Sequence, residues 1–231
     1  MTAEPRKAIF DAVKALVPDV WNDAGRIHAM DNVLDSFGVP REAANKSRTL
    51  ADPAKFFAVV RKITGSLDQV QVDTITRILA GAAHWPVGWL AYGLATAWHE
   101  ARLKPIPEWG KGAGRPYAKA GKYGQAQYGR GLVQLTWDAN YEWADKALGL
   151  DGSLLANFDR ALEPDIAARI LILGMETGAF TGKKLADYIG ERGTPANFKS
   201  ARRIINGTDK ADLIADHAVK FQAALDAGGW A

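Results

Sequence analysis

The sequence predicts a mainly α fold. Apolar residues recur at helical spacing along most of the chain, and no run of alternating apolar and polar residues is long enough to suggest a sheet. Helix start signals are also frequent along the chain. With 231 residues, of which 48% are hydrophobic, the chain can bury a substantial core in one or two domains.

The helix start signals fix the expected elements in order. Asp52 followed by Pro53 is typical of an N-cap with proline at the first helical position, and Ser66 with Gln69 fits a capping box for the next helix. Asp138 is the expected cap of a later helix. Beyond the helix that follows Ser66, the helices are expected over residues 86–103, 139–148, 164–179, 182–189, 196–205 and 209–226.

The domain organisation is simple. We expect an N-terminal helical segment over residues 1–65 and a main domain over residues 66–231, with the alternative that both pack as one domain. The clearest shift in composition is the polar stretch 40–52, which is the candidate linker.

Composition excludes several classes of chemistry. Because cysteine is absent, disulfides, zinc–thiolate sites and a thiol nucleophile are excluded. The four histidines are scattered without ligand spacing, so we expect no metal and no cofactor. The longest apolar stretch, residues 85–98, is shorter than the ~20 residues of a spanning helix, so we expect no stable membrane insertion. The N-terminus lacks the apolar core of a secretory signal, which predicts retention in the cytoplasm.

Charge is unevenly distributed, although the formal net charge is only +3. Residues 104–130 hold six basic side chains against one acid, Glu108. This stretch is either a solvated loop or a basic rim that attracts an anionic polymer. Nucleic-acid binding is disfavoured, because the basic residues are scattered through a glycine-rich loop rather than along a recognition helix. The six residues are Lys104, Lys111, Arg115, Lys119, Lys122 and Arg130.

Two glutamates flank the end of a strongly apolar helix. Glu100 lies near the C-terminal end of that helix, where burial and the helix dipole both favour the protonated form of a carboxyl group. Glu108 follows two prolines that direct the chain into a wetter environment. Such a pair suits a general acid and a general base of a glycosidase. A salt-bridged Glu100 and an exposed Glu108 would explain the same residues without catalysis.

The stretch that follows is rich in glycine and then in polar and aromatic residues. Seven glycines lie between Gly110 and Gly131, which permits tight turns and close approach of the backbone to a ligand. Amide and hydroxyl groups bind sugar hydroxyls, and aromatic rings cover the apolar faces of sugars. Trp109, beside Glu108, is the expected sugar-stacking tryptophan. The polar and aromatic cluster comprises Tyr128, Arg130, Gln134, Thr136, Trp137, Asn140 and Tyr141.

These residues carry a family resemblance. "HE" at 99–100, "YGRGLVQLTWDANY" at 128–141 and "RRIING" at 202–207 resemble motifs of glycoside hydrolase family 19, a chitinase family of the lysozyme superfamily. The phage endolysin branch resembles "PIPEWGKGAGRPY" and the segment 164–189 as well. The resemblance covers roughly residues 66–226. It implies a lysozyme-like, chitinase-family-19-like helical domain with a glycine-rich loop at the active-site cleft.

The resemblance also implies roles for individual residues. Glu100 would be the acid, Glu108 the base, and Thr136 the residue that helps hold the attacking water. Inversion would require the two carboxyl groups to lie roughly 6.5–9.5 Å apart. The short interval between the two glutamates departs from plant chitinases, in which the second glutamate comes much later in the chain, after a longer loop. Gln134, Asn140 and Asn206 match positions that bind substrate sugars, and Tyr128 and Arg130 belong to the same motif without an assigned role. With His99 beside the acid and Trp109 beside the base, these are the candidate substrate-binding residues.

Several assignments keep an alternative at this stage. His99 could orient Glu100 or simply be packed in the helix, and a core position is favoured for His217. Arg202 and Arg203 could contact substrate or pair with acids across helices.

The function that these observations favour is an endolysin-type peptidoglycan hydrolase with muramidase activity. It would act as a monomer and wait in the bacterial host cytoplasm until a holin-type protein gives access to the wall. The alternatives are an endochitinase, and a non-catalytic cell-wall-binding or phage structural module.

Overall fold

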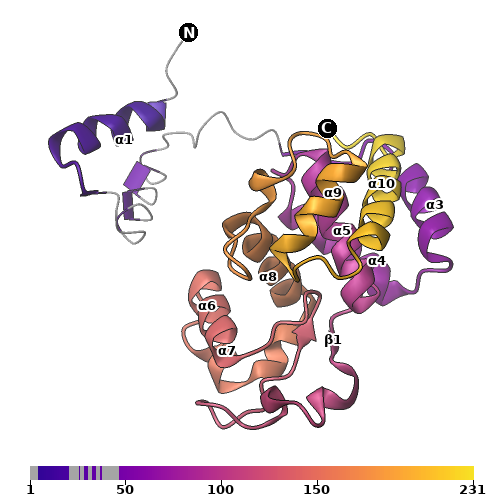
Figure 1. Ribbon diagram of the computed structural model, residues 1–231. Coiled ribbons are helices and arrows are strands. Elements are labelled where there is room, and N and C mark those ends of the chain that lie inside the picture. Colours follow the sequence, from indigo (N-terminus) through magenta and orange to yellow (C-terminus); the bar gives the residue numbers. More distant parts are fainter. Residues whose placement is uncertain (1–4, 21–25, 27–28, 31–32, 35–36, 38–46) are drawn as a thin grey trace. The chain divides into compact units, whose positions relative to one another are not determined.

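The computed structural model describes residues 5–20, 26, 29–30, 33–34, 37 and 47–231. The chain divides into two compact units, Met1–Arg48 and Thr49–Ala231 (Figure 1). In the first unit, α1 covers Pro5–Leu16. Much of the proposed linker 40–52 lies outside the described residues.

The second unit begins earlier than the proposed main domain. The helix α3 (Pro53–Thr64), which the sequence analysis placed in the N-terminal segment, packs against α10 (Ala211–Ala227) of the second unit. Phe56 and Val60 of α3 are fully buried in its core, and Leu50 forms a β-bridge with Trp230 near the C-terminus. The structure therefore places residues 49–65 with the main domain.

The second unit is built mainly from helices, as predicted. Its two strands, β1 (Ile106–Pro107) and β2 (Arg130–Gly131), form one short antiparallel pair. Among the described residues, no helix combines the length and apolar character that crossing a membrane requires. The remaining α-helices of the unit are α4 (Gln69–Gly81), α5 (Val87–Ala101), α6 (Asp138–Leu148), α7 (Ser153–Ala156), α8 (Pro164–Thr177) and α9 (Pro195–Ala201).

Helix α5 lies at the centre of the core (Figure 1). Most of its residues are buried, and it packs most extensively against α10, with further contacts to α4 and α8. This confirms the prediction of a buried core helix. The helix ends two residues earlier than the predicted residue 103, because Arg102 and Leu103 adopt positive φ angles of 53° and 58°. The chain then leaves the core, which places Glu100 in the last turn of α5.

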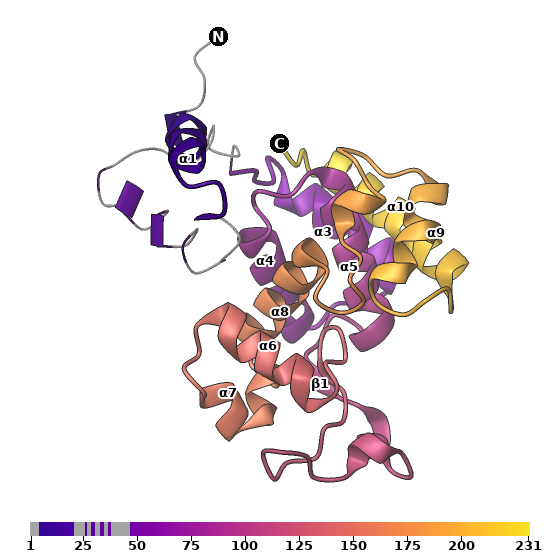
Figure 2. The same ribbon diagram turned by 60° about the vertical axis from the view of Figure 1, so that its left-hand side comes forward.

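A lobe of loops follows α5 and is named here the loop lobe (residues 106–137). It contains β1, β2 and two short 3₁₀ helices, η3 (Trp109–Gly112) and η4 (Pro116–Ala118). Figure 2 shows that it extends away from the α5–α10 pair on the side of α6 and α7. Pro107 pairs with Arg130 in the β1–β2 register, and the Glu108 amide donates to the Gly129 carbonyl at 2.7 Å. The strand pair therefore fixes the backbone position of Glu108 at the start of the loop lobe.

Two predicted helices differ from the structure. Residues 182–189 contain only the 3₁₀ turn η6 (Leu185–Asp187), because Gly182 has a φ of +78° and Lys184 is extended. The helix expected over 196–205 is divided into α9 and the 3₁₀ turn η7 (Arg202–Ile204). A further 3₁₀ turn, η5 (Phe158–Leu162), precedes α8.

The helix caps were predicted with mixed success. Asp52 caps α3 as expected, since its carboxylate accepts from the Lys55 amide at 2.9 Å. The cap of α4 is Asp68 rather than Ser66, because Asp68 and Gln71 form the capping box. The Asp138 prediction was wrong. Its carboxylate accepts from the backbone amide of Lys122 in the loop lobe, and α6 begins without a side-chain cap.

Candidate active site

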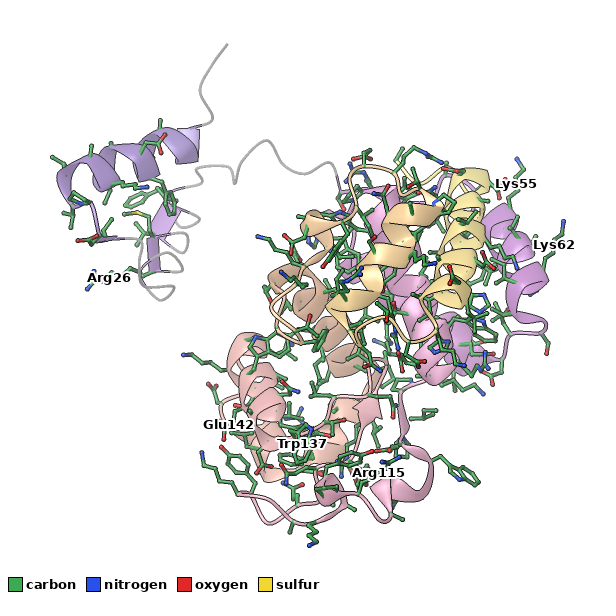
Figure 3. The ribbon with its side chains drawn as sticks, in the orientation of Figure 1. Arg26, Lys55, Lys62, Arg115, Trp137 and Glu142 are labelled. Carbon is green, nitrogen blue, oxygen red and sulfur yellow. The ribbon has the colours of Figure 1, made fainter. Side chains whose placement is uncertain are left out.

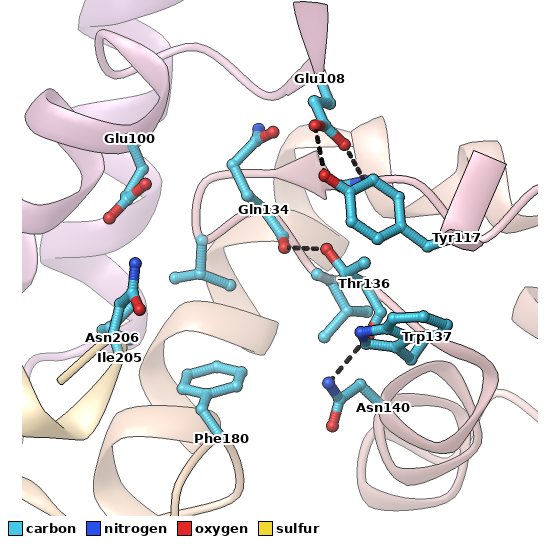
Figure 4. A pocket seen from close by; sticks show the side chains of 13 residues that line it. Glu100, Glu108, Tyr117, Gln134, Thr136, Trp137, Asn140, Phe180, Ile205 and Asn206 are labelled. Atoms are coloured by element: carbon cyan, nitrogen blue, oxygen red, sulfur yellow. Dashed lines mark hydrogen bonds between the residues drawn. The ribbon is translucent and has the colours of Figure 1, made fainter. Parts of the chain in front are cut away.

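A cleft of about 460 Å³ opens where the end of α5 faces the loop lobe (Figure 4). This volume lies within the range of small-ligand pockets, ~300–1,000 Å³. Six of the predicted site residues line the cleft: Glu100, Glu108, Gln134, Thr136, Asn140 and Asn206. The other lining residues are Tyr117, Gly129, Val133, Leu135, Trp137, Phe180 and Ile205.

Glu100 forms one wall of the cleft, with Asn206 beside it (Figure 4). Its Oε1 accepts from Nη1 of Arg202 at 2.7 Å, and the two side chains are 18% and 2% exposed. Nε of Arg202 donates to the Asp209 carbonyl. Arg202 is thus the ion-pair partner of Glu100, which decides between the two alternatives left open for this arginine. The pair holds Oε1 of Glu100, while Oε2 has no protein hydrogen-bond partner among the described residues.

Glu108 lies on the opposite wall, on the loop lobe (Figure 4). Its Oε1 accepts from the Tyr117 hydroxyl at 2.9 Å, and its Oε2 accepts from the Gly129 amide at 3.2 Å. The hydrogen bond to Glu108, followed by burial, raises the pKa of the Tyr117 phenol. Trp137 meets the Tyr117 ring edge-on, with the ring centroids 5.6 Å apart. Both oxygens of Glu108 are therefore held by donors.

Polar side chains of one tight turn lie between the two walls. Gln134 has a positive φ of 53°, and the Arg130–Leu135 bridge closes the turn. The Thr136 hydroxyl donates to the Gln134 carbonyl at 2.8 Å, and the Asn140 amide donates to the Thr136 carbonyl at 2.8 Å. The Thr136 oxygen keeps its lone pairs for a proton from water or substrate.

Four predicted substrate-binding residues do not line the cleft. Arg130 is only 4% exposed and donates to Asp159, to two backbone carbonyls and to the Tyr141 hydroxyl. Its guanidinium lies 3.6 Å from the centre of the Tyr128 ring, so the two buried side chains pack together and stabilise the loop lobe. Trp109 is 98% exposed and does not line the cleft.

His99 is the fourth of these residues. It is half-buried, and burial, opposed by the charge of Glu100, lowers its pKa. His217 of α10 is also half-buried, and burial together with Lys220 lowers its pKa as well. Nδ1 of His217 is buried without a hydrogen-bond partner among the described residues. Neither histidine lines the cleft.

Six aromatic or aliphatic residues of the cleft were not predicted as site residues: Tyr117, Val133, Leu135, Trp137, Phe180 and Ile205. Tyr117 lies in the "GRPY" stretch that resembles the endolysin branch, and Trp137 lies in the polar and aromatic cluster, so both had a signal. Phe180 and Ile205 also lie in stretches that carry the resemblance, 164–189 and 202–207, but no local pattern marked them as cleft residues. They reach the cleft through the packing of the segments that follow α8 and α9. Phe180 is held edge-on by Trp143, with ring centroids 5.9 Å apart.

Three of the six basic side chains of residues 104–130 form ion pairs. Lys104 pairs with Asp68, Lys122 with Glu142, and Arg130 with Asp159. The other three side chains are exposed on the loop lobe, as Figure 3 shows for Arg115, and have no carboxylate partner among residues 47–231. These three, named here the loop cations, are Lys111, Arg115 and Lys119.

No cluster of three or more potential metal ligands occurs in the part of the chain that the structure describes.

Comparison with known proteins adds little to this geometry. No family model matches the sequence, and no curated protein matches it. Among solved structures, the chain is similar to chitinase C from Streptomyces griseus HUT6037, with 23% identity. The similarity covers 74% of this chain and 83% of that chain, with a TM-score of 0.41. At this identity and TM-score the likeness assigns neither a family nor an activity.

Proposed function

We propose that the protein is an inverting glycoside hydrolase that cleaves β-1,4 bonds between the amino sugars of bacterial peptidoglycan. The observation that carries this proposal is the placement of Glu100 and Glu108 on opposite walls of one cleft, with hydroxyl and amide groups between them (Figure 4). Two carboxyl groups that flank a sugar-sized cleft are the arrangement that glycosidic hydrolysis uses.

Each glutamate has one task in this reaction. Glu100 gives a proton to the glycosidic oxygen as the bond to the anomeric carbon breaks, and its unpartnered Oε2 is the oxygen available to carry that proton. Glu108 accepts a proton from the water that attacks the anomeric carbon from the other side. The Thr136 hydroxyl helps to hold this water, since it lies in the same cleft.

The remaining lining residues suit a sugar chain. Gln134, Asn140 and Asn206 offer amide groups to sugar hydroxyls and acetamido groups. The rings of Trp137 and Phe180, with the aliphatic lining residues, cover apolar sugar faces. The exposed Trp109, next to Glu108 in the sequence, offers a further ring for sugar stacking.

Peptidoglycan is favoured over chitin by charge and by the endolysin-like motifs. The loop cations attract a polymer that carries carboxylates, whereas chitin is neutral. An endochitinase would share every catalytic residue and remains the second candidate. A non-catalytic wall-binding module is disfavoured, because binding alone gives no reason for two carboxylates held by dedicated partners across a cleft.

The biological setting belongs to the same proposal. The protein would act as a monomer, without a cofactor, as an endolysin. It would be held in the host cytoplasm and reach the wall when a holin-type protein permeabilises the membrane.

The test is to identify the products. Purified protein is incubated with bacterial walls stripped of outer membrane and, separately, with chitin oligomers, and the new ends are identified by mass spectrometry. New reducing ends on muramic acid, absent with Glu100→Gln, would support the muramidase. Cleavage of chitin alone would favour the chitinase, and no glycosidic product from either polymer would refute both.

A further inference from the structure

We infer that Tyr117 is a positioning residue that fixes the Glu108 carboxylate in the orientation needed to activate water. The inference rests on the proposed function, since it gives Glu108 the role of base. It starts from the 2.9 Å hydrogen bond that the Tyr117 hydroxyl donates to Oε1 of Glu108.

The loop lobe is shaped to hold the Tyr117 ring. Gly112 has a φ of +70°, and a Cβ atom at this position would lie 2.6 and 2.8 Å from two atoms of the ring. Only glycine leaves this space without displacing the ring. Trp137 covers another side of the ring at an interplanar angle of 86°, and the Tyr117 carbonyl accepts from the Gln127 amide at 2.8 Å. Ring and backbone are both fixed.

The consequence is a carboxylate with two separate anchors. Tyr117 holds Oε1, and the Gly129 amide holds Oε2. Each carboxylate oxygen has a further lone pair, so Glu108 can still accept a hydrogen bond from the attacking water. If the phenol hydroxyl is removed, one anchor is lost and the carboxylate can turn about its last torsion. A misplacement of ~1 Å in a reacting group costs on the order of 10²-fold in rate.

Tyr117 also lines the cleft, so a role in sugar contact must be separated from positioning. Tyr117→Phe keeps the ring and removes only the hydroxyl. Positioning predicts that kcat falls about 10–100-fold while KM changes less than about 3-fold. A rise in KM with unchanged kcat would overturn the inference, because it would make the hydroxyl a substrate contact.

Tyr123 provides a matched control in the same lobe. Its hydroxyl donates to Oε1 of Glu142 at 2.9 Å, the same chemistry at the same distance, but Tyr123 does not line the cleft. Tyr123→Phe should therefore keep the wild-type kcat. An equal loss of kcat in both variants would show that any tyrosine–glutamate bond of the lobe supports its fold, and would overturn a specific role for Tyr117.

A double variant tests whether Tyr117 acts through Glu108. In Glu108→Ala, added azide can replace the activated water. Azide forms a bond to the anomeric carbon while the bond to the leaving oxygen breaks, and Glu100 protonates that oxygen. Because no carboxylate remains to be positioned, Tyr117→Phe should leave the azide-rescued rate unchanged in this background. A further loss similar to that in the wild-type background would overturn the inference.

A readout independent of activity separates this inference from the proposed function. The hydrogen bond to Glu108 raises the pKa of the Tyr117 phenol. In Glu108→Gln the phenol should ionise at lower pH, measured as the difference in phenolate absorbance from the matching Tyr117→Phe protein. An unchanged titration would overturn the contact. If wild type cleaves no glycan, the proposed function fails, while this titration still decides whether Tyr117 and Glu108 interact.

Discussion

Replacement of Glu100 is predicted to lower stability as well as to stop turnover, because a buried charge depends on it. The Arg202 side chain is 2% exposed, and Glu100 is the carboxylate partner of its guanidinium. Removal of one member of a buried ion pair leaves the other charge without compensation, which costs about 3–5 kcal/mol.

The magnitude depends on what replaces the carboxylate. Glu100→Ala removes the charge and both oxygens. Because the Glu100 side chain is 18% exposed, water can approach Arg202 in the variant. We therefore expect the free energy of unfolding to fall by an amount near the lower limit, about 3 kcal/mol. Glu100→Gln keeps an acceptor for Arg202 but replaces the ion pair by a hydrogen bond from the charged guanidinium to a neutral amide oxygen, at a cost of about 1–2 kcal/mol. For a domain of this size that corresponds to a fall in Tm of roughly 2–8 °C.

Guanidinium denaturation followed by circular dichroism measures these losses, and the same samples give turnover on cell walls at 25 °C. Glu163→Gln is the control, since Glu163 forms an exposed pair with Arg160 that contributes little to stability. Wild-type stability in Glu100→Ala would refute the description of Arg202 as a buried charge that needs this partner. Near wild-type turnover in a folded Glu100→Gln would remove Glu100 as the acid.

Three further predictions concern the water, the histidines and the loop cations. Thr136→Val should lower kcat by about 10–100-fold without unfolding, if its hydroxyl positions the water; an unchanged kcat would make Thr136 structural. Burial lowers the pKa of His99 and His217 in the folded state. As the pH falls below the unfolded-state pKa of ~6.5, the unfolded chain therefore binds more protons than the folded chain, and stability is lost. Denaturation at pH 7.5 and pH 5 should show this loss, and His217→Gln should reduce it; equal losses in both proteins would refute the role of His217. Changing all three loop cations to glutamine should slow wall cleavage at low salt and weaken its salt dependence, and an unchanged salt dependence would refute electrostatic attraction to the wall.

Local sequence patterns predicted those site residues whose position is set by their neighbours in the sequence. The apolar run that forms α5 and the prolines after it place Glu100 at a helix end and Glu108 on a loop, as the sequence analysis expected. Thr136 and Asn140 share one turn and helix start, so a single motif carries both into the cleft. Some of the residues that line the cleft can therefore be predicted from short stretches of the sequence.

Long-range partners escaped the sequence analysis. Arg130 stands among polar and aromatic residues that suggest sugar binding, but its carboxylate partner is Asp159, far along the chain, and pairing with it buries the guanidinium. For Glu100 and Arg202 an ion pair was among the alternatives, but the sequence could not match the two residues, because only the packing of the core brings their helical segments together. Tyr117 reaches Glu108 because Gly112 leaves space for its ring, a tertiary fit with no periodic signal.

The stereochemistry of the first product decides whether Glu100 and Glu108 act as acid and base on opposite sides of one bond. Proton NMR of a soluble β-1,4-linked glycan, recorded before the product mutarotates, shows which anomer is released. Attack of water from the Glu108 wall predicts the α-anomer, formed by wild type and absent with Glu108→Ala. Release of the β-anomer would contradict the proposed mechanism, since retention requires a covalent intermediate or an equivalent double displacement.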